Sequence, residues 1–125
     1  MPYMKHSPEF LRVCEEARSR VKEITPEEVL EKQKRGDKFV LVDVREDNEW
    51  AAGHAKGAIH LGRGVIERDI VGAVPDKNAH LILYCGGGFR SALAGDSIQN
   101  LGYKNVQSMC EGMRGWRERG YPEEK

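Results

Sequence analysis

An almost wholly apolar run of six residues, 39–44, is the feature that most restricts the fold of this chain. The run is short and rich in β-branched side chains, which indicates a strand buried on both faces, as in a parallel sheet. Similar short runs occur at 58–61, 81–84 and 106–109, and residues 21–24 could add an edge strand. Helical segments lie between these runs, so the sequence predicts an α/β fold with a parallel sheet.

Capping residues mark two helix starts. Ser7 followed by Pro8 is typical of an N-cap and a first helical position, and the helix that follows carries Cys14 on its apolar face. Thr25 and Glu28 form a capping box, and that helix should end near Gly36. Further helices are expected at about 46–52, 65–71, 91–101 and 113–119.

Charge and cysteine content exclude several classes of function. The chain has 125 residues with 20 basic and 20 acidic side chains, so it lacks the basic excess of a nucleic-acid-binding domain. No apolar run approaches the roughly 18 residues of a membrane span, and the N-terminus lacks the apolar core of a signal peptide. We therefore expect a cytoplasmic protein of one domain. Three cysteines without a C-x-x-C pair predict neither a disulfide framework nor a metal site, and no cofactor is indicated.

Cys85 directly follows the strand predicted at 81–84, and active sites of parallel sheets lie beyond the carboxyl ends of the strands. The three glycines at 86–88 leave the backbone free to curl until its N–H groups form an anion-binding nest. The helix expected from about Ser91 adds the positive end of its dipole. Both effects favour the thiolate of Cys85, and Arg90 supplies a planar fork suited to sulfur or phosphorus oxyanions.

The spacing from Cys85 to Arg90 distinguishes the candidate reactions. Only four residues intervene, whereas tyrosine phosphatases have five and form a cradle sized for phosphate. A shorter loop suits a single terminal sulfur atom better, and no aspartate is placed as a general acid for a leaving alkoxide. Sulfur transfer needs no such acid because sulfite is a good leaving group. The structural alternative is a glycine-rich turn that carries an inert cysteine.

Three segments in order resemble the rhodanese (thiosulfate sulfurtransferase) family, single-domain type, over residues 21–122. Residues 43–61, DVREDNEWAAGHAKGAIHL, are similar to the family's D-x-R…E-[FYW]-x-x-G-H signature. Residues 85–91, CGGGFRS, are close to its C-x-x-G-x-R-S loop, and residues 112–122, GMRGWRERGYP, are similar to its C-terminal G-G-x-x-x-W-x-x-x-G-x-P. On this resemblance, 1–20 is an N-terminal helical extension, 21–122 the rhodanese domain and 123–125 a tail.

The resemblance implies a rhodanese-like α/β fold with a central, mainly parallel five-stranded sheet and helices on both faces. It also implies covalent catalysis, in which the Cys85 thiolate takes the outer sulfur of thiosulfate or a similar small anionic donor. The persulfide would then pass its sulfur to cyanide or to a thiol, including a protein thiol. The expected site consists of the nucleophile Cys85 and the substrate-binding residues Gly86, Gly87, Gly88, Phe89, Arg90, Ser91 and Arg63.

The remaining signature residues are expected to be scaffolding. Arg45 and Glu49 are four residues apart at a helix start and could form an ion pair. Arg63 follows the strand at 58–61, so it is expected on the same sheet edge as Cys85, where it could bind an anion or remain a solvated loop charge.

Two positions near the third segment depart from the family or add a second thiol. Glu111 replaces the first glycine of the family's pair, and it could either bind an arginine or repel small anionic donors. Cys110 could act as a resolving cysteine, although an inert small side chain is the simpler interpretation. Two other functions stay open: a non-catalytic rhodanese-type binding or regulatory module, and a phosphatase or arsenate reductase.

Overall fold

A computed structural model describes residues 6–125, so the first five residues of the expected N-terminal extension lie outside the described part. The helices are α1 (Pro8–Arg18), α2 (Pro26–Arg35), α3 (Asp47–Ala51), α4 (Ile66–Ala73), α5 (Phe89–Gln99) and α6 (Gly112–Glu118). The strands are β1 (Lys22–Ile24), β2 (Val40–Asp43), β3 (His54–Ala55), β4 (Ile59–His60), β5 (Leu81–Tyr84), β6 (Val106–Met109) and β7 (Glu123–Glu124). No helix within residues 6–125 is long and apolar enough to cross a bilayer.

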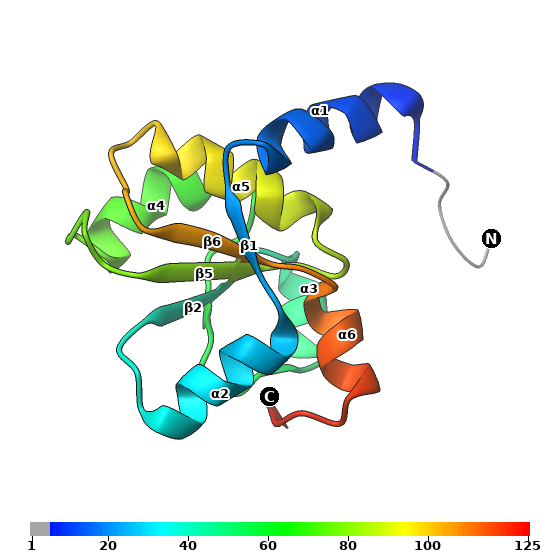
Figure 1. The fold of residues 1–125 in the computed structure, drawn as a ribbon, viewed down its shortest axis with the longest axis vertical. Coiled ribbons are helices and arrows are strands. Elements are labelled where there is room, and N and C mark those ends of the chain that lie inside the picture. The colour runs from blue at the N-terminus through cyan, green and yellow to red at the C-terminus, as the bar shows by residue number, and fades with distance from the viewer. Residues whose placement is uncertain (1–5) are drawn as a thin grey trace.

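The five-stranded sheet has the order β1-β6-β5-β2-β4, and every neighbouring pair is parallel. The predicted parallel α/β architecture is therefore confirmed, with β1 at one edge as expected. Strand β5 lies in the middle of the sheet, between β2 and β6 (Figure 1). All four of its residues are buried, which explains why this run consists of three aliphatic side chains and a tyrosine and carries no charge. Its carboxyl end delivers Cys85.

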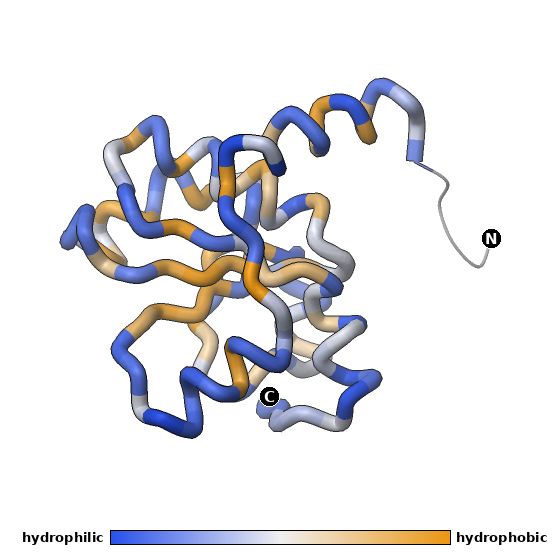
Figure 2. The backbone as a smooth tube through the Cα atoms, viewed as in Figure 1, coloured by the Kyte–Doolittle hydropathy of each residue, from blue (hydrophilic) through white to orange (hydrophobic). Residues whose placement is uncertain are grey.

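Helices cover both faces of the sheet, as Figure 1 shows: α1, α4 and α5 lie on one side, and α2 and α6 on the other. Each face has its own core because successive side chains of a strand point to opposite faces. Leu81 and Leu83 of β5 join the cluster under α4 and α5, whereas Ile82 and Tyr84 join the cluster under α2 and α6. Figure 2 accordingly shows the hydrophobic residues gathered on the strands.

The helix starts follow the capping signals in the sequence. Ser7 Oγ accepts a hydrogen bond from the Phe10 N–H at 3.1 Å, and Thr25 forms the predicted capping box with Glu28. Gly36 ends α2 in the left-handed conformation with φ of 73°. Helix α1 packs on α5, and Cys14 of α1 is fully buried, as its place on the apolar face predicted.

A second, two-stranded sheet was not expected from the sequence. Strand β7 pairs antiparallel with β3, so that His54 lies opposite Glu124 and Ala55 opposite Glu123. The division based on the resemblance gives residues 123–125 as a tail, and the two adjacent glutamates of β7 form no apolar pattern that indicates a strand. This pairing joins the end of the chain to the segment that precedes β4.

Candidate active site

Cys85 lies at the carboxyl end of β5, where the chain turns through three glycines into α5. Its side chain is buried, and the Gly88 N–H donates a hydrogen bond to its Sγ at 3.1 Å. Ser91 Oγ lies 3.6 Å from the same sulfur and is itself 2.8 Å from Ser108 Oγ. A backbone N–H aimed at sulfur stabilises negative charge there, so the arrangement suits a thiolate or a persulfide anion.

The turn between β5 and α5 is tighter than the sequence indicated. Helix α5 begins at Phe89, two residues before the expected start near Ser91, and Gly88 precedes it with φ of 103°. That φ lies in the left-handed region, which glycine adopts without strain. The left-handed turn at Gly88 therefore brings its N–H back onto the sulfur of Cys85.

Helix α6 holds the other side of the loop. The Met113 N–H donates to the carbonyl oxygen of Cys85 at 2.7 Å, and the Arg114 N–H donates to that of Gly86 at 3.1 Å. Gly112, with φ of 51°, lies directly against this backbone, and a Cβ at that position would overlap with Cys85 and Gly86. The loop is thus fixed by backbone contacts to α6, which begins 27 residues after Cys85.

Arg90 is held by a carboxylate from another part of the chain. Its Nη1 donates to Glu49 Oε1 at 2.7 Å, and its Nη2 donates to Glu49 Oε2 at 3.2 Å. The hydrogen bond from Arg90 lowers the pKa of Glu49 below its ordinary value, although partial burial acts in the opposite direction. The two-point ion pair orients Arg90 beside the loop and connects α5 to α3.

The expected pair between Arg45 and Glu49 is wrong, because Arg45 binds Asp43 instead. Arg45 Nη2 lies 2.8 Å from Asp43 Oδ2 and also donates to the carbonyl oxygen of Gly53 at 2.8 Å. Both side chains of the Arg45–Asp43 pair are buried. Four-residue spacing favours a pair only on a continuous helix, and Arg45 precedes α3, which begins at Asp47.

A cavity of about 240 Å³ opens onto Cys85. Four of its lining residues belong to the predicted loop, and the other three, which are not among the predicted site residues, are His6, Phe10 and Arg114. The rings of His6 and Phe89 are 4.8 Å apart, and those of Phe10 and Phe89 are 6.0 Å apart. His6 and Phe10, at the start of the described residues, therefore form part of the cavity wall.

The sequence contained a partial signal for one of these three residues. Arg114 lies in the third signature segment, which ends near the active edge of the sheet, but nothing in its spacing indicated contact with the loop. His6 and Phe10 reach the cavity only because α1 packs across α5, and no sequence pattern specifies that packing. A larger hollow of about 490 Å³ between α2 and β2 has no cysteine in its lining.

Arg63 is not among the described residues that line the Cys85 cavity. Its Nη1 pairs with Glu67 Oε2 of α4 at 3.0 Å, and Ser97 also donates to that carboxylate. Its predicted part in anion binding has no support from these contacts and stays a prediction.

Glu111 pairs with Arg119, with Nη1–Oε1 and Nη2–Oε2 distances of 3.0 and 3.1 Å. Of the two expectations for this carboxylate, the structure shows the salt bridge with an arginine. Cys110 is half-buried beside it. Burial raises the pKa of Cys110, and the carboxylates of Glu23 and Glu111 raise it further. Within residues 6–125, no three His, Cys, Asp or Glu side chains gather as metal ligands would.

Comparisons with known proteins point to a single family. The sequence profile of the Rhodanese-like domain matches residues 25–119. The chain is 34% identical over 96 residues to thiosulfate sulfurtransferase GlpE of Haemophilus influenzae, which covers 76% of this chain and 87% of that protein. It is 36% identical over 106 residues to thiosulfate sulfurtransferase GlpE of Pseudomonas putida, which covers 85% and 93%.

Two solved structures extend the similarity. A protein of unknown function from Rhodopseudomonas palustris, described as a possible tyrosine phosphatase, superposes with a TM-score of 0.83 at 28% identity over 99% of both chains. The polysulfide-sulfur transferase homodimer of Wolinella succinogenes superposes with a TM-score of 0.79 at 24% identity, over 93% of this chain and 87% of that one. The second likeness shows a shared fold.

Proposed function

The chain belongs to the rhodanese-like domain family, and we propose that it is a sulfurtransferase of the thiosulfate sulfurtransferase type that works through a persulfide on Cys85. One observation carries the proposal: Cys85 faces a small cavity, and the Gly88 N–H donates to its sulfur. A buried cysteine that only fills space needs neither a cavity nor a donor on its sulfur.

In the first half-reaction, the Cys85 thiolate attacks the outer sulfur of thiosulfate. The new bond joins Sγ to that sulfur, the S–S bond of thiosulfate breaks, and its electron pair leaves with sulfite. The product is a Cys85 persulfide anion, whose charge the loop N–H stabilises. In the second half-reaction, cyanide or a thiolate attacks the outer sulfur of the persulfide, which restores the Cys85 thiolate.

The composition of the cavity wall favours sulfur transfer over phosphoester hydrolysis. Hydrolysis requires a general acid for the leaving alkoxide, and the described lining residues of the cavity include no aspartate or glutamate. The nearby carboxylate of Glu49 is held by Arg90. Four residues between Cys85 and Arg90 further support a ring sized for a single sulfur atom.

Mass spectrometry tests this function directly. After incubation with thiosulfate, the intact protein should gain the mass of one sulfur atom, and cyanide should remove that mass with the release of thiocyanate. Cys85→Ser should prevent the gain, whereas Cys14→Ala and Cys110→Ser should keep it. Failure of the unmodified protein to gain sulfur from thiosulfate and from polysulfide would exclude the proposal. Turnover of an aryl phosphate under those conditions would instead favour the phosphatase.

A further inference from the structure

The two arginines that line the Cys85 cavity differ in how their charges are compensated. Arg90 uses both terminal nitrogens to bind Glu49, so its charge is largely balanced within the protein. Within residues 6–125, no Asp or Glu oxygen lies within ion-pair distance of Arg114, and its side chain donates no hydrogen bond to a described residue. Arg114 therefore keeps its N–H groups available to a ligand in the cavity.

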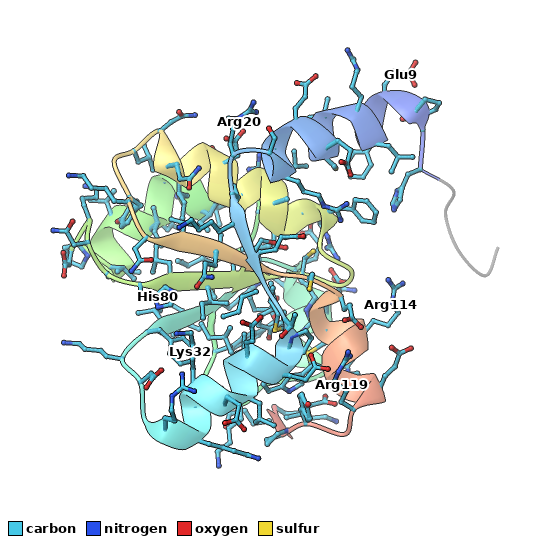
Figure 3. All side chains as sticks on the ribbon, in the orientation of Figure 1. Glu9, Arg20, Lys32, His80, Arg114 and Arg119 are labelled. Atoms are coloured by element: carbon cyan, nitrogen blue, oxygen red, sulfur yellow. The ribbon has the colours of Figure 1, made fainter. Side chains whose placement is uncertain are left out.

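Backbone contacts place the guanidinium of Arg114 beside the loop. The Arg114 N–H binds the carbonyl oxygen of Gly86, and a Cβ on Gly87 would lie 3.1 Å from Arg114 Nη2. The guanidinium thus rests on a glycine that presents no side chain to it. Figure 3 shows the Arg114 side chain extending from α6 on the side where the loop enters α5.

The remainder of the described cavity wall brings no carboxylate to Arg114. Its other side chains are the rings of His6, Phe10 and Phe89, and no carboxylate lies among the described lining residues. Arg114 is exposed, so its guanidinium lies at the open edge of the cavity, where it can meet an anion that enters from solvent. The cavity is small, with a thiol at one side and an uncompensated guanidinium at another.

We propose that Arg114 is the specificity residue that binds the anionic end of the sulfur donor, and that Arg90 positions the loop. This inference rests on the proposed sulfurtransferase function. The planar fork of Arg114 can donate two hydrogen bonds to the sulfonate oxygens of thiosulfate while the outer sulfur faces Cys85. The site should therefore prefer a dianionic donor over a monoanionic one of similar size.

The kinetic test compares thiosulfate, which carries two negative charges, with methanethiosulfonate, which carries one. Arg114→Gln should raise the KM for thiosulfate about tenfold or more, as expected for the loss of a hydrogen bond between charged groups, and leave kcat within about threefold. The KM for methanethiosulfonate should rise less. Arg114→Lys should recover part of the affinity, since it keeps the charge and loses the fork.

Arg68→Gln is the matched control, because it removes the same charge from an exposed arginine of α4 that pairs with Asp69. It should leave both KM values unchanged. An equal rise in KM in Arg68→Gln and Arg114→Gln would show that KM responds only to the net charge of the protein, and it would overturn the inference. An unchanged KM for thiosulfate in Arg114→Gln would overturn it as well.

Sulfate binding separates this inference from the proposed function, because sulfate has the charge and oxygens of the donor but no transferable sulfur. Sulfate should raise the Tm of the wild-type protein and of Cys85→Ser above the rise given by an equal ionic strength of chloride. Arg114→Gln should reduce that difference to the smaller general effect that sulfate has on any folded protein. Persulfide formation without sulfate stabilisation would leave the sulfurtransferase proposal standing and refute the role of Arg114. Sulfate stabilisation that depends on Arg114, without persulfide formation, would support anion binding by Arg114 and refute the sulfurtransferase proposal.

Discussion

Gly112 packs against the carbonyl oxygen of Cys85 so closely that its hydrogen atoms are the only substituents that fit between the two backbones. The φ of Gly112 is 51°, a conformation that other residues adopt only with strain. The next residue, Met113, donates its N–H to the same oxygen. The backbone of Cys85 therefore contacts the backbone at the start of α6 directly, with no side chain between them. The position of the nucleophile thus depends on the position of α6.

Substitution of this glycine should damage both stability and activity. Gly112→Ala should lower the free energy of unfolding by at least about 2 kcal/mol, from the strained φ and the overlap with the loop, and should reduce kcat more than tenfold. Urea denaturation and thiocyanate release measure the two effects. Gly72→Ala in α4 is the control, because no atom lies within 4 Å of the new Cβ. Equal behaviour of the two variants would contradict the role of this contact.

The ion pair between Glu49 and Arg90 should appear in the pH dependence of stability. The pKa of Glu49 is lowered in the folded state, so its contribution is complete above the unfolded value of about 4.3 and is lost as the pH falls through the folded pKa. Glu49→Gln should therefore lower the Tm at pH 7. The difference from the wild type should shrink as the pH falls below about 4.3. A difference that stays constant down to pH 3 would show that the charge of Glu49 is irrelevant.

The buried pair of Asp43 and Arg45 should matter far more than an exposed one. Asp43→Asn leaves the Arg45 guanidinium buried without its counter-charge and should cost about 3–5 kcal/mol in the free energy of unfolding. Asp37→Asn breaks a solvent-exposed pair with Arg35 by the same chemistry and should change the free energy of unfolding far less, because solvent screens that pair. Chemical denaturation of both variants checks the contrast, and similar losses would refute it.

Cys110 should be dispensable for turnover. Its pKa is raised by burial and by neighbouring carboxylates, so the side chain remains a thiol at neutral pH and is a poor nucleophile. Cys110→Ser should keep kcat/KM within about twofold of the wild type, since no reactive group is lost. The assay is thiocyanate release, together with a peptide map under non-reducing conditions. A disulfide between Cys85 and Cys110 after turnover, or a persulfide that accumulates in Cys110→Ser, would assign it a resolving role instead.

The sheet could be predicted from the sequence because burial on both faces leaves a strong local pattern. All four side chains of β5 are buried in one of the two cores, so the run carries no charged residue, and the hydroxyl of Tyr84 accepts a hydrogen bond from the Ala55 N–H. The helix starts at Pro8 and Pro26 could also be predicted, since capping depends on residues three positions apart. The pairing of β3 with β7 was missed because it depends on backbone hydrogen bonds between short segments far apart in the chain.

Only the part of the candidate site that lies in one continuous loop could be predicted from the sequence. The order from Cys85 to Arg90 indicated a thiolate beside an arginine, and the structure places both in one cavity. The partner of Arg90 was missed because Glu49 is 41 residues away, and local spacing suggested Arg45 for Glu49 instead. Arg114 and Phe10 reach the cavity through the packing of helices on opposite sides of the sheet.

The hydrogen bonds from α6 to the carbonyl groups of Cys85 and Gly86 have a kinetic consequence. Ordering a free loop around a substrate lowers the entropy of the encounter and slows productive capture. Here that entropy is already lost when the chain folds, because α6 holds the loop before any donor arrives. Donor capture should thus resemble the collision of an ion with a rigid receptor, and the loop can hold the thiolate and the persulfide in turn without opening.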